Sequence, residues 1–412
     1  MPDRLQVWLE GAHVADVERP RRSDARLRLR HTDEALERWP LNTPLVSCSL
    51  PVSNRPAAAN AFLRGLLPEG DALAVMAARA GISVADTFGL LERYGRDVAG
   101  ALVIGAEAPD ASRFDLEPYS DESLGEEVGA LDQNPLGVHD DSELSLAGLQ
   151  NKLLLVKTDR GWARPRNGYP STHILKAEDR RFPGIVEAEY RCLSLARRLG
   201  LTPVETEFLV AGGIPCLITE RYDRIVTERG VRRVHQEDLC QAVGIDGAGN
   251  RGRAKYQRRG GGGPGFRQAA QLLEAHAQDA GEELGRLVAA LSFTIAVGNA
   301  DAHAKNISLL HDTEATIRLA PVYDVTSTLL WANLTAESAL SVNGHFSLQR
   351  LTIADIAAEA ASWPYERAAA ERIASETVEQ LRAVLTTLDS DAQRRLVEAR
   401  CEALLAGKPA GG

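Results

Sequence analysis

The strongest constraint on the fold is a long apolar run, EELGRLVAALSFTIAVG, that ends in a cluster of polar side chains. Leu284, Leu287, Val288, Leu291 and Ile295 recur at helical spacing, and apolar residues lie nearly all round the expected helix. A helix of this kind has to be buried, so the run predicts a central helix of a large core. The stretch GNADAHAKNIS follows directly and places several chargeable residues at the end of that helix.

The spacing of three polar residues in and after this stretch fits phosphoryl transfer. Asp301 precedes Asn306 by five positions, and two expected strands, ISLLH and TIRLAPVYD, lead from there to Asp324. In kinases one carboxylate orients the attacking hydroxyl and accepts its proton, while an Asn and a second carboxylate hold Mg²⁺ against the nucleotide phosphates. The order therefore predicts Asp301 as the catalytic residue and Asn306 and Asp324 as metal ligands.

The half of the chain before this helix contains the other parts of an ATP site in the same order. SLAGLQNK, residues 145–152, could present backbone N–H groups to phosphates, although taken alone it is more typical of a structural turn. Lys176 could neutralise phosphates with Glu189 as its partner, but Glu187 is a rival and a solvated helix edge is an alternative for Glu189. The backbone of residues 220–222, in ITERYDR, could bond the adenine edge.

Composition limits the partners and the compartment. The formal net charge of -10 argues against nucleic-acid binding by the whole surface, so DNA contact would have to come through a partner. The start, MPDRLQVWLEGAH, lacks a signal-peptide core, and no apolar run is long enough for a bilayer, so we expect a soluble cytoplasmic protein without membrane contact. An odd number of cysteines without a CxxC pair indicates reduced thiols rather than disulfides or a zinc site.

The pattern along the chain predicts an α+β fold with two kinase lobes. Short alternating strands and helical segments indicate a separate N-terminal subdomain over residues 1–110. Residues 111–143 have the acidic, proline- and glycine-containing composition of a connecting segment. We expect a small lobe, a sheet with one helix, over residues 144–222 and a mostly helical catalytic lobe over residues 223–412. Lys176, Asp301, Asn306 and Asp324 should converge on one cleft.

A set of short motifs, spread over nearly the whole chain, occurs together in a fixed order: SLPVSNRPAAANAFLRGLLPEG, LLERYGRDVAGAL, SLAGLQNK, HILK, EAEYRCLSLARRLGL, ITERYDR, HQEDLCQAVG, GGPG, GNADAHAKNIS and LAPVYDV. In this combination the chain resembles the HipA-type serine/threonine kinases, the toxins of HipA–HipB toxin–antitoxin modules. The resemblance implies a bilobal, protein-kinase-like fold with an extra N-terminal subdomain.

The resemblance also implies Asp301 as the catalytic residue and ATP with Mg²⁺ as cofactors. It implies nucleotide contacts from Ala147, Gly148, Leu149, Gln150, Asn151, Lys152, Lys176, Glu220, Arg221, Tyr222, His303, Ala304, Lys305, Asn306, Tyr323 and Asp324. His303 and Lys305 would face the nucleotide or the transferring phosphate, and a loop position in solvent is the alternative for each.

The biology that the resemblance implies concerns translation. Members of the family phosphorylate a serine of an aminoacyl-tRNA synthetase, halt translation, and are restrained by a DNA-binding, helix-turn-helix antitoxin of the HipB type. A family serine at the position of Ser145 is itself phosphorylated. Because that phosphate adds nearly two negative charges to the loop proposed to hold ATP, we expect autophosphorylation of Ser145 to be inhibitory. An ordinary turn serine is the alternative.

A basic, glycine-rich insertion precedes GGPG. This basic segment, residues 247–263, has no acidic residue and contains Arg251, Arg253, Lys255, Arg258 and Arg259. A mobile surface loop is one interpretation, and a site that recruits an acidic substrate or an RNA-bound protein is the other. The sequence leaves both open.

Two other functions remain as alternatives. A small-molecule kinase could use the same set of Asp301, Asn306 and Asp324, but it would not need the N-terminal subdomain. A catalytically silent co-repressor of a DNA-binding antitoxin would be expected to have lost one of these three residues, and all are present.

Overall fold

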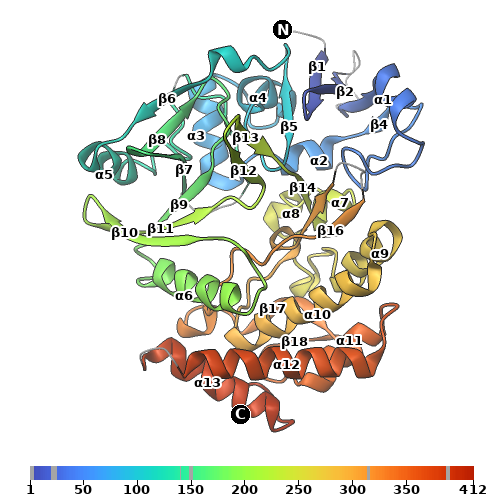
Figure 1. Ribbon diagram of the computed structural model, residues 1–412, viewed down its shortest axis with the longest axis vertical. Coiled ribbons are helices and arrows are strands. Elements are labelled where there is room, and N and C mark those ends of the chain that lie inside the picture. The colour runs from blue at the N-terminus through green and yellow to red at the C-terminus, as the bar shows by residue number, and fades with distance from the viewer. Residues whose placement is uncertain (1–3, 20–25, 140, 148–151, 313–315, 387–389) are drawn as a thin grey trace. The chain divides into compact units, whose positions relative to one another are not determined.

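The structure is a computed structural model that describes residues 4–19, 26–139, 141–147, 152–312, 316–386 and 390–412. The chain forms two compact units (Figure 1). The first comprises Met1–Glu178, Glu207–Ala248 and His311–Ala315, and the second comprises Asp179–Thr206, Gly249–Leu310 and Thr316–Gly412. Each unit is therefore built from segments that are distant in the sequence, and the expected boundaries near residues 110, 143 and 222 stay predictions.

The first unit begins with a five-stranded sheet of order β4-β3-β2-β1-β5. Its strands are β1 (Arg4–Leu9), β2 (Ala12–Glu18), β3 (Arg28–His31), β4 (Ala57–Ala58) and β5 (Leu102–Gly105), and its helices are α1 (Asp33–Arg38), α2 (Asn60–Gly65), α3 (Gly70–Ala80) and α4 (Thr87–Tyr94). Exposed and buried residues alternate along β3, as the period of two in the sequence predicts.

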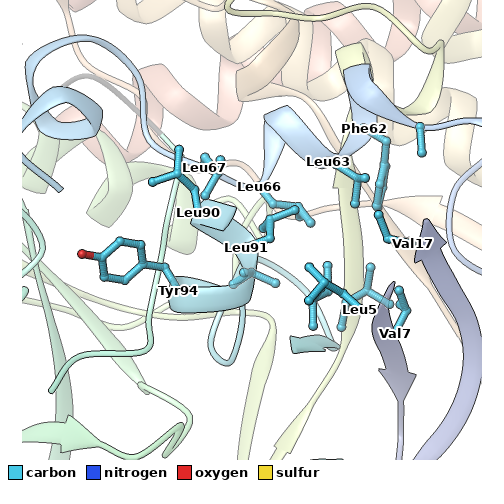
Figure 2. Close-up of a cluster of buried hydrophobic side chains, with 14 of the residues drawn as sticks. Leu5, Val7, Val17, Phe62, Leu63, Leu66, Leu67, Leu90, Leu91 and Tyr94 are labelled. Carbon is cyan, nitrogen blue, oxygen red and sulfur yellow. The ribbon is translucent and has the colours of Figure 1, made fainter. Parts of the chain in front are cut away.

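One hydrophobic core joins this sheet to its helices. Figure 2 shows Leu5 of β1, Leu63 of α2 and Leu91 of α4 in one cluster of hydrophobic side chains, and all three are fully buried. Each buried side chain of this size contributes about 1.5–3 kcal/mol relative to an exposed one. Tyr94 reaches the same core and donates its hydroxyl to the Met76 carbonyl at 3.0 Å, so its polar atom is satisfied.

The rest of the first unit is a six-stranded sheet of order β10-β11-β9-β7-β8-β6. Its strands are β6 (Asp115–Pro118), β7 (Lys152–Thr158), β8 (Gly161–Arg166), β9 (His173–Ala177), β10 (Thr206–Ala211) and β11 (Ile214–Glu220), and β12 (Arg224–Thr227), β13 (Gly230–Arg233), β14 (His235–Asp238) and α7 (Leu239–Ala242) follow. The strands β7 to β11 form the sheet that the sequence predicts within residues 144–222. Lys176 lies on β9, between β11 and β7.

Residues 111–143, the predicted connecting segment, contain regular secondary structure. They form η1 (Ala111–Arg113), the edge strand β6 and α5 (Asp121–Gly129), and β6 pairs antiparallel with β8. Leu124 and Val128 of α5 share a core with Leu153 and Leu175 of the sheet. A four-residue strand and a nine-residue helix are too short to give a clear period against a polar background.

A buried ion network ties the turn after α4 to the segment after β11. Arg221 donates to both carboxylate oxygens of Asp223, at 2.9 and 2.8 Å, and Arg224 donates to Asp97 at 2.8 Å. Burial alone would raise the pKa of Asp97, but the charges of Arg224 and Arg221 and a hydrogen bond from Ser171 hold that pKa below its ordinary value. The Asp97 and Asp223 carboxylates therefore stay ionised and balance the positive charges of the buried arginines.

The same network fixes the backbone at Val98 and Gly100. Both arginines donate to the Val98 carbonyl, and Gly100 donates its N–H to Asp223 at 2.8 Å. Gly100 has a φ of +80°, and a Cβ there would lie 2.8 Å from the backbone of Gln236. Only glycine fits this turn without a backbone shift.

The second unit is mostly helical (Figure 1). Its elements are α6 (Ile185–Arg198), α8 (Gly249–Gly252), η2 (Arg258–Gly260), α9 (Phe266–His276), α10 (Ala280–Val297), η3 (Ala304–Asn306), β15 (Ser308–His311), β16 (Ile317–Leu319), η4 (Thr328–Leu330), β17 (Glu337–Val342), β18 (His345–Ser347), α11 (Ile353–Ala361), α12 (Arg367–Leu385) and α13 (Ala392–Leu405). The one helix expected within residues 144–222 is α6, which is amphipathic and buries Ala188, Cys192 and Leu195. Within the described residues, no helix combines the length and the apolar composition that a bilayer crossing needs.

Helix α10 is the predicted central helix. Every residue of it from Glu283 onward is buried or half-buried, and it packs against α9, α11, α12 and α13. It ends at Gly298, whose φ of +73° closes the last turn in the left-handed conformation. A Cβ at Gly298 would also lie 2.9 Å from Leu329, so glycine is required here for both conformation and space.

All five cysteines are free thiols, and all except Cys48 are buried. The ligand-capable atoms of Cys48, Glu237 and His311 lie within 4.8 Å of one another. Hydrogen bonds already account for this grouping, because the Glu237 carboxylate accepts from the Ser47 hydroxyl and from the Cys48 amide at 2.8 Å. Burial and the neighbouring carboxylate raise the pKa of the Cys48 thiol.

Two buried histidines make the first unit sensitive to acid. Burial lowers the pKa of His31 to about 4, and burial together with the nearby His311 lowers that of His235 to about 4. An unfolded histidine titrates near pH 6.5, so between pH 6.5 and pH 4 the unfolded chain takes up protons that the folded chain does not. The free energy of unfolding should therefore fall by about 2 kcal/mol per histidine between pH 6.5 and pH 5.

Urea unfolding at several pH values measures this dependence. His31→Leu should have a smaller loss of stability between pH 6.5 and pH 5 than the wild type, whatever its stability at pH 7. His345→Gln, at an exposed position on β18, is the control and should keep the wild-type dependence. An unchanged pH dependence in His31→Leu would contradict the assignment.

Candidate active site

Three side chains, those of Asn299, Asn306 and Thr328, hold the backbone of the polar loop after α10. Asn299 accepts the N–H of Asp301 through its side-chain oxygen at 3.0 Å, and the Asn306 amide donates to the Asp301 carbonyl at 3.1 Å. Thr328 accepts the N–H of Ala300 at 2.8 Å and donates to the Gly298 carbonyl at 3.1 Å. The loop therefore fixes the backbone on both sides of Asp301, while about half of the Asp301 side chain stays exposed.

His303 and Lys305 are not solvent-facing loop residues. Both are buried, with exposed fractions of 7% and 9%, and Ala304 between them is fully buried. The ring of His303 meets the ring of Tyr256 edge to face at 5.1 Å. The alternative that these two side chains lie in solvent is therefore wrong, while their proposed contact with a nucleotide stays a prediction.

Asn306 and Asp324 line the same small cavity of the second unit. The cavity has a volume of about 50 Å³ and an apolar wall that includes Phe266, Leu287 and Leu291. Asp324 is exposed and has a φ of +52°, which is uncommon for a residue with a side chain. Such a conformation costs of order 1 kcal/mol or more and is often retained where function needs it. Asn306 and Asp324 therefore line one cavity, and their role as metal ligands stays a prediction.

Tyr323 links the loop to the hairpin that leads to Asp324. Its hydroxyl donates to the Lys305 carbonyl at 2.7 Å and lies 2.6 Å from the Ser308 hydroxyl. The ring of Tyr323 also lines the cavity. Its observed contacts thus connect the two segments that carry Asn306 and Asp324.

In the first unit, Lys152 and Lys176 occupy directly opposite positions of the β7–β9 pair. Both are buried, with exposed fractions of 7% and 8%, and the ammonium group of Lys152 donates to the Ala147 carbonyl at 2.9 Å. The predicted contacts at Gly148, Leu149, Gln150 and Asn151 lie outside the described residues.

Arg221 has a structural role that the sequence did not reveal. Its side chain is about 1% exposed and is used by the ion network with Asp223 and Ser171. Its backbone N–H donates to the Thr172 carbonyl at 2.9 Å, and its own carbonyl accepts from Arg224 at 3.1 Å. Its described contacts are therefore structural, while the adenine contact of residues 220–222 stays a prediction.

Two residues of the basic segment contact Asp301, and sequence reasoning missed this role. The Tyr256 hydroxyl donates to Asp301 Oδ1 at 3.1 Å, and a guanidinium nitrogen of Arg258 lies 3.5 Å from the same oxygen. Lys255, which directly precedes Tyr256 in the sequence, is buried. This part of the basic segment is thus not a mobile surface loop. Its density of glycines was the one available signal, because glycines also permit close packing of backbone.

Comparisons with known proteins agree with this architecture. A sequence model described as HipA-like C-terminal domain matches residues 144–385, and one described as HipA N-terminal domain matches residues 5–105. The putative kinase Y4mE of Sinorhizobium fredii is 36% identical over 368 residues, which are 86% of this chain and 83% of the relative. The serine/threonine-protein kinase toxin HipA of Shewanella oneidensis is 29% identical over 297 residues, which are 69% of this chain and 66% of that protein.

A solved structure of HipA from Shewanella oneidensis MR-1, in complex with HipB and operator DNA, superposes with a TM-score of 0.81. It covers 98% of this chain and 96% of the solved chain at 23% identity. The fold is therefore the α+β, kinase-like fold of HipA, which confirms the predicted fold class. The chain belongs to the HipA family, and it is a HipA-type kinase.

Tyr323→Phe should lower the free energy of unfolding by about 1–2 kcal/mol, because the Lys305 carbonyl and the Ser308 hydroxyl both lose their partner. Urea denaturation measures the difference. Tyr365→Phe is a matched control, since the Tyr365 hydroxyl makes no hydrogen bond within the described part of the chain. Equal stability of Tyr323→Phe and the wild type would show that the hydroxyl does not support the loop.

Proposed function

We propose that this chain is an ATP- and Mg²⁺-dependent serine/threonine protein kinase and the toxin of a toxin–antitoxin module. The observation that carries the proposal is the hydrogen-bonded loop that presents Asp301 while Asn306 from the same loop shares a cavity with Asp324. Asp301 orients the substrate hydroxyl and accepts its proton. Residues 144–222 act as the small lobe and residues 223–412 as the catalytic lobe.

The donor set around the cavity fits Mg²⁺. Asn306 and Asp324 supply oxygen ligands, which Mg²⁺ prefers, and the exposure of Asp324 leaves room for the water molecules that this ion retains. When bound, the ion neutralises charge on the nucleotide phosphates. Tyr323 holds the two segments that carry these ligands at a fixed separation through its bonds to Lys305 and Ser308.

ATP contacts in the first unit follow from the paired lysines. Lys176 and Lys152 bring two buried positive charges to adjacent positions of the sheet, a suitable environment for phosphate oxygens. Residues 147–152 contribute backbone N–H groups, and the backbone of residues 220–222 contacts the adenine edge. Glu189 on α6 is the proposed ion-pair partner of Lys176, and it is 5% exposed, which argues against a solvated helix edge for it.

The proposed substrate is a protein serine on an aminoacyl-tRNA synthetase, and its phosphorylation would halt translation. A HipB-like, helix-turn-helix antitoxin is the proposed partner, which is supported by the complex in which the Shewanella relative was solved. The net charge of -10 favours DNA contact through that partner. A small-molecule kinase and a catalytically silent co-repressor remain the competing functions.

Phosphoproteomics after brief expression of the wild type and of Asp301→Ala tests the proposal. Serine or threonine phosphorylation on a translation enzyme in the wild type alone would support it. ATP turnover that needs no protein substrate would favour the small-molecule kinase. Absence of turnover in the wild type under all conditions would favour the silent co-repressor.

Asp301→Ala should reduce phosphoryl transfer by at least about 100-fold while ATP binding stays measurable, because Asp301 acts on the incoming hydroxyl. Asp324→Ala should instead weaken Mg-ATP binding, because it removes a proposed metal ligand. Calorimetry with Mg-ATP separates the two effects. Equal loss of nucleotide affinity in both variants would contradict this division of roles.

Ser145 is proposed to be an inhibitory autophosphorylation site, and its position defines what phosphorylation requires. Its side chain is fully buried and donates to the Leu66 carbonyl at 3.0 Å, while its N–H donates to the Asp97 carbonyl at 2.8 Å. A phosphate with nearly two negative charges cannot replace a buried hydroxyl that donates to a carbonyl. The segment therefore has to leave this position to be phosphorylated, which favours transfer between molecules and prevents its return.

Ser145→Asp should depress ATP affinity, whereas Ser145→Ala should bind ATP and never acquire the phosphate on this segment. Calorimetry gives the affinities, and mass spectrometry of protein incubated with Mg-ATP gives the phosphorylation site. A fully active enzyme that carries stoichiometric phosphate on Ser145 would exclude the inhibitory role.

A further inference from the structure

Two residues of the basic segment contact one oxygen of the Asp301 carboxylate. Tyr256 Oη and the Arg258 guanidinium both lie against Oδ1, at 3.1 and 3.5 Å. Within the described part of the chain, the Asp301 carboxylate makes its side-chain contacts through Oδ1, and 51% of the side chain remains exposed. The two groups therefore fix the orientation of the carboxylate without covering it.

Both residues are themselves anchored. One guanidinium nitrogen of Arg258 donates to the Ala300 carbonyl at 2.9 Å and to the Glu337 carbonyl at 2.7 Å. The guanidinium carbon lies 4.6 Å from the centre of the Tyr256 ring, which adds a cation–π contact. The Lys255 carbonyl accepts the N–H of Ala304, so the basic segment is bonded to the Asp301 loop on both sides of that residue.

The glycines of the basic segment serve this packing. The N–H of Gly263 donates to the Tyr256 carbonyl at 2.9 Å, so the chain turns back over Tyr256. A Cβ at Gly261 would overlap the Tyr256 carbonyl, and one at Gly263 would lie 2.7 Å from the Ala254 carbonyl. The glycine-rich composition therefore gives a tight backbone turn rather than a flexible linker.

We propose that Tyr256 and Arg258 are positioning residues for phosphoryl transfer, which hold Oδ1 of Asp301 so that Oδ2 receives the hydroxyl of the protein substrate. The inference rests on the proposed function of Asp301. A carboxylate on a flexible side chain can turn either oxygen, or neither, toward a substrate, and alignment of reacting groups is a large part of catalysis in this reaction class. Because the guanidinium and the phenol contact one oxygen only, the other is oriented by them, and the side chain as a whole stays half exposed.

Tyr256→Phe is the mildest test, because it keeps the ring that contacts Arg258 and His303 and removes only the hydroxyl. We expect kcat for protein phosphorylation to fall about tenfold, with less than a twofold change in the KM for ATP. In Arg258→Gln, kcat should fall at least as far. Arg258→Lys should keep part of the wild-type kcat because lysine retains the positive charge. Arg267→Gln, an exposed cation on α9, is the matched control and should keep wild-type kinetics.

A double-mutant cycle separates positioning from general support of the fold. In an Asp301→Ala background, Tyr256→Phe should cause no further loss of the residual activity, because the group it positions is gone. Thermal melting checks that each variant is folded, and Tyr256→Phe keeps the test valid if Arg258→Gln does not fold. Full activity of Asp301→Ala would overturn the proposed function itself.

Three results would overturn the positioning role while the function of Asp301 stands. The first is wild-type kcat in Tyr256→Phe. The second is an equal further loss in the Asp301→Ala background. The third is an increase in kcat in Tyr256→Phe or Arg258→Gln, which would mean that the contacts restrain Asp301 rather than orient it.

Discussion

The buried end of α10 is the constraint on which the catalytic unit depends. Its last residues, Ile295 to Val297, are buried, and two guanidinium nitrogens of Arg400 on α13 donate to the Ile295 carbonyl. Burial lowers the pKa of Arg400 to about 10, so it stays charged at neutral pH and complements the negative end of the helix. Gly298 then turns the chain sharply, and the Asp301 loop starts from a rigid base.

From that base, backbone bonds rather than side-chain packing shape the site. Asn299, Asn306 and Thr328 each use a side chain to satisfy backbone groups of the loop, so the Asp301 carboxylate takes no part in holding the loop backbone and contacts Tyr256 and Arg258 instead. Tyr323 repeats this arrangement on the hairpin that leads to Asp324. Polar groups with fixed partners need little reorganisation when charge develops during a reaction, and this is a general source of catalytic power.

The first unit uses a different device, a buried cluster of ion pairs. Burial of these four charged side chains costs much desolvation energy. The cluster, which consists of Asp97, Asp223, Arg221 and Arg224, nevertheless provides hydrogen-bond partners for the backbone of an irregular turn, which apolar residues could not do. The turn they fix also accepts the N–H of Ser145 through the Asp97 carbonyl. The position of the segment proposed to contact ATP thus depends on the same buried charges.

The sequence by itself determined the features that have a local period or a fixed spacing: the buried helix α10, the amphipathic helix α6, and the order of Asp301, Asn306 and Asp324. Only the tertiary structure decided the rest. The strand and helix within residues 111–143, the structural use of Arg221, and the contacts of Tyr256 and Arg258 with Asp301 join segments far apart in the chain. Such contacts leave no periodic trace, because each depends on a single side chain meeting a partner that only the folded backbone brings within reach.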